Sequence, residues 1–430
     1  MRVLVVGGGA REHALASRLA AEPDVDELIC TPGNPGIGSV ARLAAADIAR
    51  PDALLALAES ERIDLTVVGP ELPLSLGVAD RFARAGRPLL GPSAAAARLE
   101  SSKAFAKAFM ARHRVPTAAF RICDTSADAL DVIRSGEFAF PVVLKADGLA
   151  AGKGVVVADD RLEAEAAVAA AMEERRFGDA GARLVIEECL AGPEVSFFVL
   201  SDGRRALPIG AAQDHKRIFD ADRGPNTGGM GAFAPTPLVT EALQHQVMRQ
   251  IVEPVISGMA AEGSPFRGFL YVGLMLTSSG PKVIEFNVRL GDPEAQVVLP
   301  LVGEPLLPLL VASASGELRC SACRLLSERL VGVVLASRGY PESYESGRPI
   351  SGIAKADGLP AVSVYHAGTA WRDGALVTAG GRVLTVVGRG AGFAEAIARA
   401  YDGVSRISFD GMQYRRDIGR KALQFDADPS

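Results

Sequence analysis

The stretch KVIEFNVRLGDPE, residues 282–294, joins a β-strand pattern to an acidic turn. Side chains alternate across a strand, so residues 282, 284, 286 and 288 are predicted to face one side and residues 283, 285, 287 and 289 the other. The second face carries Glu285, Asn287 and Arg289. A carboxylate and a side-chain amide two residues apart suit Mg²⁺, which takes few protein ligands and completes its shell with water and phosphate oxygens. The alternative is the charged edge of a half-exposed strand.

Length and composition indicate a multidomain globular protein. The chain has 430 residues, of which 48% are hydrophobic and 23% charged, enough for roughly two to four domains. The net charge of −5 argues against a nucleic-acid partner, which would require a basic excess. No apolar run reaches the roughly 18 residues needed to span a membrane. The opening MRVLVVGGGAREH reads as a first strand rather than a signal peptide.

The cysteines favour a reducing compartment, and we therefore expect a cytoplasmic protein. There are five, scattered along the chain, which does not indicate a disulfide framework. Cys320 and Cys323 form a CxxC, but no second such pair and no His pair stands at zinc-finger spacing. A metal or redox role for this pair needs structural support that the sequence does not offer.

The first hundred residues predict a doubly wound α/β domain. Strands at 3–6, 27–30, 65–68 and 88–90 alternate with helices ending near residue 21 and spanning 52–62 and 74–85. The turn after the first strand, Gly7 to Gly9, resembles a dinucleotide fingerprint, but Glu12 takes the place of its third glycine. Hydride chemistry is therefore disfavoured. Backbone N–H groups at the helix start still predict an anion site, with Arg11 nearby.

The middle of the chain predicts a phosphate-binding flap. A helical stretch is interrupted at Ser101-Ser102, where we place the first domain boundary. Residues 141–157, PVVLKADGLAAGKGVVV, read as two strands joined by a glycine-rich loop, with Lys145 on the first strand. No helix follows the loop lysine, which excludes a Walker A motif. A solvated hairpin tip is the alternative. From residue 331 the pattern predicts a third, compact α+β unit.

Several long segments together carry a resemblance to a known family. They are VGGGAREHA, GPELPL, PSAAAARLESSKAFAK, KADGLAAGKGV, QDHKR, GPNTGGMGA, IEFNVRLGDPE and YRRDIG. In these the chain resembles the ATP-grasp superfamily and, within it, the phosphoribosylamine–glycine ligases, also called glycinamide ribonucleotide synthetases. The resemblance spans essentially the whole chain. Phe219 is one departure, because family members tend to carry glycine there.

The resemblance implies an architecture and a reaction. It implies an N-terminal doubly wound domain (1–102), a central ATP-grasp domain (103–328) with a flap subdomain at about 118–190, and a C-terminal α+β domain (329–430). The implied activity is the ATP-dependent ligation of glycine to 5-phosphoribosylamine in purine synthesis, through a glycyl phosphate, with Mg²⁺ or Mn²⁺. A monomer is expected, with transient contact to the preceding pathway enzyme, and neither nucleic acid nor membrane as partner.

Resemblance and site chemistry together assign roles to particular residues. The expected metal ligands are Glu285 and Asn287. The expected nucleotide-binding residues are Lys103, Lys145, Gly152, Lys153, Gly154, Glu187, Glu188, Leu190 and Glu194. The expected substrate-binding residues are Gly8, Gly9, Arg11, Glu71, Asp214, Arg289, Gly291 and Asp292. Arg289, Lys145 and Asp292 are the expected catalytic residues.

Two further functions remain as alternatives. One is a different ATP-grasp ligase or carboxylase, against which the long GPNTGGMG match argues. The other is a catalytically silent nucleotide-binding protein, which would have lost Glu285, Asn287 or Lys145, all of which are present.

Overall fold

The structure is a computed structural model that describes residues 1–149 and 154–426. Its N-terminal domain is the predicted doubly wound unit. The parallel sheet has the order β3-β2-β1-β4-β5, and residues 3–6 of β1 are fully buried because helices cover both of its faces. The elements are β1 (Arg2–Gly7), α1 (Ala10–Ala20), β2 (Glu27–Pro32), β3 (Arg42–Leu43), α2 (Pro51–Ser60), β4 (Leu65–Val68), α3 (Glu71–Ser75), α4 (Val78–Arg84), β5 (Leu89–Leu90) and α5 (Ala94–Ser101).

One predicted helix of this domain is two helices in the structure. The stretch 74–85 is divided at Gly77, whose φ of 82° lies in the left-handed region. Glycine adopts that conformation without a steric penalty, so the chain turns there and α3 ends before α4 begins. Glu71 is the first residue of α3.

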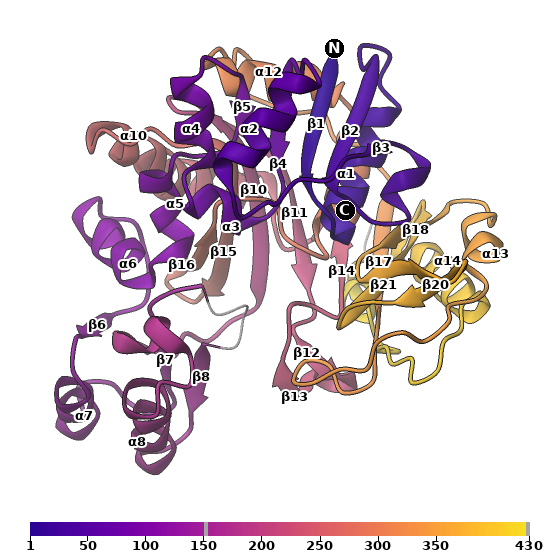
Figure 1. Ribbon diagram of the computed structural model, residues 1–430. Coiled ribbons are helices and arrows are strands. Elements are labelled where there is room, and N and C mark those ends of the chain that lie inside the picture. The colour runs from indigo at the N-terminus through magenta and orange to yellow at the C-terminus, as the bar shows by residue number, and fades with distance from the viewer. Residues whose placement is uncertain (150–153, 427–430) are drawn as a thin grey trace.

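The flap subdomain is a small antiparallel sheet of order β6-β9-β7-β8, backed by helices. In Figure 1 it projects at the lower left, away from the C-terminal domain on the right. Its elements are β6 (Phe120–Cys123), α7 (Ser126–Ser135), β7 (Val142–Ala146), β8 (Val155–Ala158), α8 (Arg161–Val168) and β9 (Leu184–Glu188), and α6 (Lys103–Arg112) leads into it. The predicted loop residues Gly152 and Lys153 lie outside the described residues.

An eight-stranded sheet of order β16-β15-β10-β11-β14-β17-β21-β18 forms the centre of the molecule. The C-terminal strands join the ATP-grasp strands where β14 pairs with β17, so this sheet crosses the expected boundary at residue 329. The strands are β10 (Glu194–Asp202), β11 (Ala206–Asp214), β14 (Gly231–Ala234), β15 (Arg267–Thr277), β16 (Gly280–Asn287), β17 (Arg329–Ala336), β18 (Val362–His366) and β21 (Arg382–Gly390).

Helices and two short hairpins complete the chain. The helices are α9 (Glu241–Val247), α10 (Glu253–Ala261), α11 (Ala295–Val298), α12 (Leu306–Ser315), α13 (Ile353–Asp357), α14 (Phe393–Arg406) and α15 (Leu423–Asp426), and the hairpins are β12 (Arg217–Phe219) with β13 (Arg223–Asn226) and β19 (Thr369–Arg372) with β20 (Ala375–Thr378). Phe219 is exposed and its backbone is extended, a conformation that any residue adopts. No helix among the described residues is long and apolar enough to cross a membrane.

Strand β16 corrects the simple alternation predicted for residues 282–289. The pairing with β15 slips between Gly273 and Leu274, which pair with Glu285 and Val283, so Ile284 is an extra residue. Such a bulge shifts the side chains by one position. Val283 therefore packs in the core with Phe286 instead of sharing the face of Glu285, and Ile284 lines a cavity instead of joining the core.

Candidate active site

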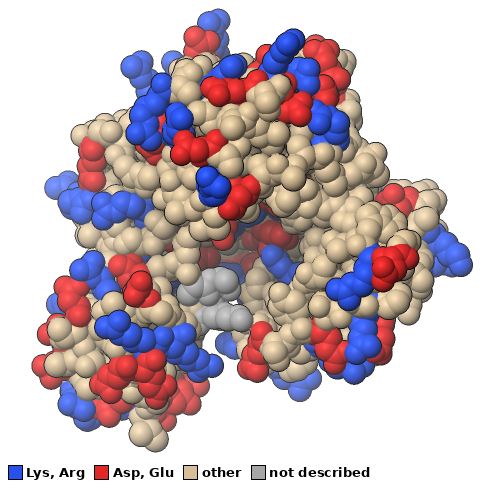
Figure 2. Space-filling model, in the orientation of Figure 1, with Lys and Arg blue, Asp and Glu red and all other residues tan. Residues whose placement is uncertain are grey.

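A cavity of about 550 Å³ opens where the N-terminal domain, the flap subdomain and the C-terminal domain meet. It lies in the central hollow of the face shown in Figure 2, where acidic side chains are visible deep between the lobes. Many residues predicted from the sequence line it, and they are Arg11, Glu71, Lys103, Lys145, Gly154, Glu187, Asp214, Glu285, Asn287, Arg289, Gly291 and Asp292. Gly8, Gly9, Glu188, Leu190 and Glu194 are outside this lining.

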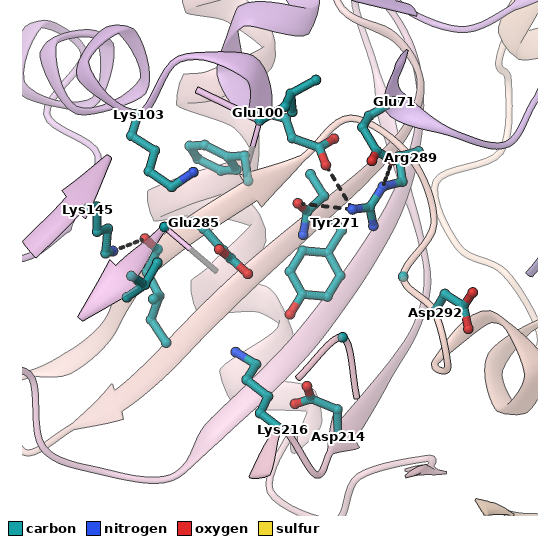
Figure 3. Close-up of a pocket in the computed structure, with 18 of the residues that line it drawn as sticks. Glu71, Glu100, Lys103, Lys145, Asp214, Lys216, Tyr271, Glu285, Arg289 and Asp292 are labelled. Atoms are coloured by element: carbon teal, nitrogen blue, oxygen red, sulfur yellow. Dashed lines mark hydrogen bonds and ion pairs between the residues drawn. The ribbon is translucent and has the colours of Figure 1, made fainter. Parts of the chain in front are cut away.

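Glu285 projects into the cavity among cationic side chains (Figure 3). Within residues 1–149 and 154–426 its carboxylate has no hydrogen-bond or ion-pair partner. Burial by itself would raise the pKa of Glu285, but Lys216, Lys103 and Lys145 lower it below its ordinary value. Glu285 is therefore an ionised carboxylate that has no hydrogen-bond or ion-pair partner in the described part of the chain.

A divalent cation fits this position. Asn287 presents its Oδ1 on the same side of the strand, 3.5 Å from Nη2 of Arg289. The described residues contain no cluster of three or more His, Cys, Asp or Glu that could enclose a metal by themselves. Mg²⁺ does not need one, because it binds through one or two carboxylates and shares its remaining positions with water and phosphate. Glu285 and Asn287 meet that requirement.

Lys145 belongs to a buried ion-pair chain. Its Nζ lies 3.0 Å from Oε1 of Glu187 and donates to the carbonyl of Ile284 at the bulge, also at 3.0 Å. Lys107 contacts the other carboxylate oxygen of Glu187 at 2.7 Å, and it also donates to Oγ1 of Thr117. Burial, followed by the charge of Lys145, lowers the pKa of Lys107 to about 8 although Glu187 opposes this. The Glu187 side chain, predicted to bind nucleotide, is therefore held by two lysines.

Arg289 joins the N-terminal and ATP-grasp domains. Its Nε pairs with Glu71 of α3 at 3.1 Å, and its Nη2 pairs with Glu100 of α5 at 2.8 Å (Figure 3). Glu100 also accepts the backbone N–H of Val288 at 2.7 Å. A guanidinium is planar and carries several donors, so two carboxylates fix its orientation while part of it still lines the cavity.

A second acidic group lies across the cavity from Glu285. Asp214 and Lys216 come from the end of β11 and the residues after it, and both line the cavity (Figure 3). Burial alone would lower the pKa of Lys216, but Asp214, Tyr271 and Glu194 raise it well above its ordinary value. Lys216 is therefore protonated, and its Nζ lies 2.6 Å from Glu194. Glu194, predicted to bind ribose, is engaged by this lysine.

The first glycine turn holds a carboxylate of the protein itself. The N–H of Gly9 donates to Oε2 of Glu12 at 2.7 Å, and Arg11 pairs with the other oxygen at 2.5 Å. Glu12 is 2% exposed, and it lies so close to Gly69 that a Cβ there would be 2.1 Å from its Oε1. The helix start that was predicted to bind an anion is thus occupied by the carboxylate of Glu12. Arg11, the neighbouring residue, lines the cavity.

Sequence reasoning missed a group of cavity residues. They are Glu100, Lys107, Lys216, Tyr271, Tyr340, Tyr344 and Arg382. Lys216 stands in QDHKR, so that motif offered a signal. Lys107 is one lysine in an amphipathic helix, which is a pattern typical of a solvated face. Tyr340, Tyr344 and Arg382 belong to the C-terminal domain, where no motif indicated a contribution to the site.

Comparisons with known proteins agree over the whole chain. Family models match at residues 1–100 (phosphoribosylglycinamide synthetase, N domain), 101–295 (its ATP-grasp (A) domain) and 330–421 (its C domain). The phosphoribosylamine–glycine ligase of Allochromatium vinosum is 49% identical over 432 residues, covering 98% of this chain and 99% of the relative. The ligase of the same name from Xylella fastidiosa is 50% identical over 430 residues, covering 98% of both chains.

Solved structures give the same result. The phosphoribosylamine–glycine ligase of Thermotoga maritima superposes with a TM-score of 0.85 at 34% identity, covering 97% of this chain and 100% of that one. A biotin carboxylase from Campylobacter jejuni superposes with a TM-score of 0.73 at 16% identity, covering 100% of this chain and 95% of that one, and shares the fold. The predicted fold class is confirmed. The chain belongs to the phosphoribosylglycinamide synthetase family of ATP-grasp ligases.

Proposed function

We propose that this chain joins glycine to 5-phosphoribosylamine at the expense of ATP, producing glycinamide ribonucleotide, ADP and phosphate for purine synthesis. Membership of the family supports the reaction. The observation that carries the proposal for this site is that one cavity holds Glu285, a carboxylate among lysines with no partner in the described residues, together with the Arg289 and Asp292 side chains.

The chemistry requires two displacements in succession. A carboxylate oxygen of glycine attacks the γ-phosphorus of ATP, and the bond to the bridging oxygen breaks to release ADP. The amine of phosphoribosylamine then attacks the carbonyl carbon of the glycyl phosphate, phosphate leaves, and the nitrogen loses a proton. The protein acts mainly by positioning reactants and neutralising charge, because the phosphoryl transfer needs little covalent participation.

On this proposal the lysines and Glu285 form the nucleotide side. Lys103 and Lys145 face the α- and β-phosphates, and Glu285 with Asn287 would hold Mg²⁺ or Mn²⁺. A divalent cation there neutralises charge on the phosphate chain. The Nζ of Lys103 lies 3.3 Å from the carbonyl of Gly148 in the flap, which supports closure of the flap over the phosphates. A closed flap would exclude water from the acyl phosphate.

The adenosine end lies toward the hinge between β9 and β10. The carboxylate of Glu187 is held by lysines, so the backbone of residues 188–190 is the group proposed to receive adenine. Glu188 is held by Lys282 at 3.0 Å and by the N–H of Ala119, which orders this hinge. Glu194 is proposed to accept the ribose hydroxyls, sharing its charge with Lys216.

The remaining residues form the acceptor side. Asp214 and Asp292 are proposed to receive the ammonium of glycine, and Arg289 its carboxylate or the transferring phosphoryl group. Gly8, Gly9, Arg11, Glu71 and Gly291 are proposed to contact phosphoribosylamine. Since Glu12 already accepts from Gly9, Arg11 is the member of this group best suited to bind an anion from the cavity.

One assay tests the function directly. ADP release is measured with glycine, with phosphoribosylamine, with both and with neither, and a further arm replaces glycine by bicarbonate. We expect ADP release to require both substrates, because the acyl phosphate is productive only when the amine attacks it. ADP release that is independent of either substrate, or supported by bicarbonate, would refute the ligase activity.

A further inference from the structure

The C-terminal domain supplies a guanidinium to the wall of the cavity. Arg382 is the first residue of β21 and lines the cavity near Asp292. Its Nη1 donates to the backbone carbonyls of Gly228, at 2.6 Å, and of Asp292, at 2.5 Å. Its Nη2 lies 3.2 Å from Oδ2 of Asp292. One side chain therefore contacts both the turn after β16 and the 227–230 loop, which joins β13 to β14 within the GPNTGGMGA segment.

The carboxylate of Asp292 is held at both oxygens. Gln296, which is fully buried, donates from Nε2 to Oδ1 at 2.8 Å, while Arg382 holds Oδ2. The same Nε2 lies 3.4 Å from Oγ1 of Thr385, three residues along β21. Burial alone would raise the pKa of Asp292, but Arg382, with Arg11 and Arg289 also facing it, lowers the pKa below its ordinary value.

The same part of the C-terminal domain also holds the 227–230 loop. The hydroxyl of Tyr340 accepts the N–H of Gly228 at 2.9 Å. The next residue, Gly229, has a φ of 110°, and a Cβ there would lie 2.5 Å from Cδ of Pro293. Glycine is needed at that position because the loop and the turn touch. Loop, turn and C-terminal domain thus form one packed unit.

We propose that Arg382 is a positioning residue. It fixes Asp292 and the 227–230 loop in the orientation that receives the amino group of the amino-acid substrate. Arg382 acts through Asp292 and does not itself contact the substrate. The C-terminal domain completes the acceptor side of a site whose nucleotide side belongs to the ATP-grasp domain. The inference rests on the proposed function, in which Asp292 meets an ammonium group.

The test compares two arginines of the same strand. Arg382→Gln removes the contacts to Asp292, whereas Arg389→Gln removes an ion pair with Glu328 at the surface. Steady-state kinetics use phosphoribosylamine formed in place from ribose 5-phosphate and ammonia. We expect R382Q to raise KM for glycine about tenfold to a hundredfold, the loss typical of a misplaced charge-assisted contact, and to leave KM for ATP within about twofold. R389Q should match the wild type.

Two further measurements separate positioning from a general structural defect. The acid limb of kcat/KM for glycine should move to higher pH in R382Q, because Asp292 without its guanidinium protonates more readily. Adding R382Q to Asp292→Asn should cause no further rise in KM for glycine, whereas a general defect would raise it again. Arg382→Lys keeps the charge but loses the fork, so it should raise KM for glycine less than R382Q does. If R382Q does not fold, R382K alone tests the role of Arg382 by its KM for glycine relative to its KM for ATP.

The outcomes distinguish this inference from the proposed function. Wild-type enzyme that releases ADP without needing both substrates would overturn the function itself. If wild-type enzyme needs both substrates, the function stands. If R382Q and R382K then raise the KM values for glycine and ATP equally, or raise neither, only the role of Arg382 is overturned.

Discussion

Two carboxylates on one short stretch of chain, Glu285 and Asp292, lie in opposite settings. Glu285 has no hydrogen-bond or ion-pair partner in the part of the chain that the structure describes, whereas Asp292 is held by Gln296 and Arg382. The position of Glu285 is thus left for a ligand to complete, whereas Asp292 is held in place in advance. Changes at unpaired groups should affect activity alone, and changes at paired groups should affect activity and stability together.

The largest effect is expected at the unpaired carboxylate. Glu285→Gln should lower kcat by about 10²–10³-fold, since it removes the carboxylate proposed to hold the divalent cation that neutralises charge on the phosphate chain. The free energy of unfolding without ligands should change by less than about 1 kcal/mol, because no hydrogen bond is lost. Kinetics at saturating Mg²⁺ and urea unfolding measure both, with Glu241→Gln on exposed α9 as control. Unchanged kcat would remove Glu285 from the metal site.

A paired group should behave in the opposite way. Lys107 is buried against Glu187, and its pKa of about 8 lies below the ordinary 10.5. Between those pH values the unfolded chain binds a proton that the folded chain has lost, so the contribution of Lys107 to stability rises with pH there. The difference in unfolding free energy between wild type and Lys107→Met should grow in favour of wild type by about 3 kcal/mol from pH 8 to 10.5.

The measurement is urea unfolding of both proteins at several pH values across that window. Lys355→Met, which removes an exposed lysine from α13, is the control. If the difference in unfolding free energy between wild type and K107M stays constant from pH 8 to 10.5, burial does not lower the pKa of Lys107.

Asp292 should combine both kinds of effect. Asp292→Asn keeps the shape but removes the charge that Arg382 and a substrate ammonium face. We expect kcat/KM for glycine to fall about tenfold to a hundredfold, and the free energy of unfolding to fall by about 1–2 kcal/mol because Arg382 loses its carboxylate. Enzyme kinetics and urea unfolding of the same preparation measure both. A loss of activity with no loss of stability would place Asp292 among the unpaired groups.

The sequence predicted individual residues that line the cavity better than the contacts that hold the paired groups. Glu285 and Asn287 share a strand face and a motif, and Lys145 precedes a glycine flap, so local pattern was enough to select them. The fold class also follows from local alternation of strands and helices. The bulge at Ile284 does not, because it depends on the pairing of β16 with β15.

The paired groups depend on contacts between distant segments of the chain. Arg382 meets Asp292 from 90 residues further along the chain, and Lys107 meets Glu187 across the flap. A lone arginine at a strand start or a lysine in an amphipathic helix has no local signal, because its partner is chosen by the packing of domains. Glu12 likewise looked like a departure from a nucleotide fingerprint, whereas its carboxylate closes the turn.

The smallest effect is expected at the unpaired lysine. Among the described residues Lys103 has no acidic partner within ion-pair distance, and its Nζ donates a hydrogen bond to the Gly148 carbonyl at 3.3 Å. Lys103→Met should raise KM for ATP about tenfold, the value of one charge-assisted contact to phosphate, and leave KM for glycine unchanged. Its unfolding free energy should stay within about 0.5 kcal/mol of wild type. Kinetics and unfolding beside K107M, a lysine of the same helix, provide the test. If K103M were as destabilised as K107M, pairing with a carboxylate would not be what distinguishes residues that affect stability from residues that affect activity alone.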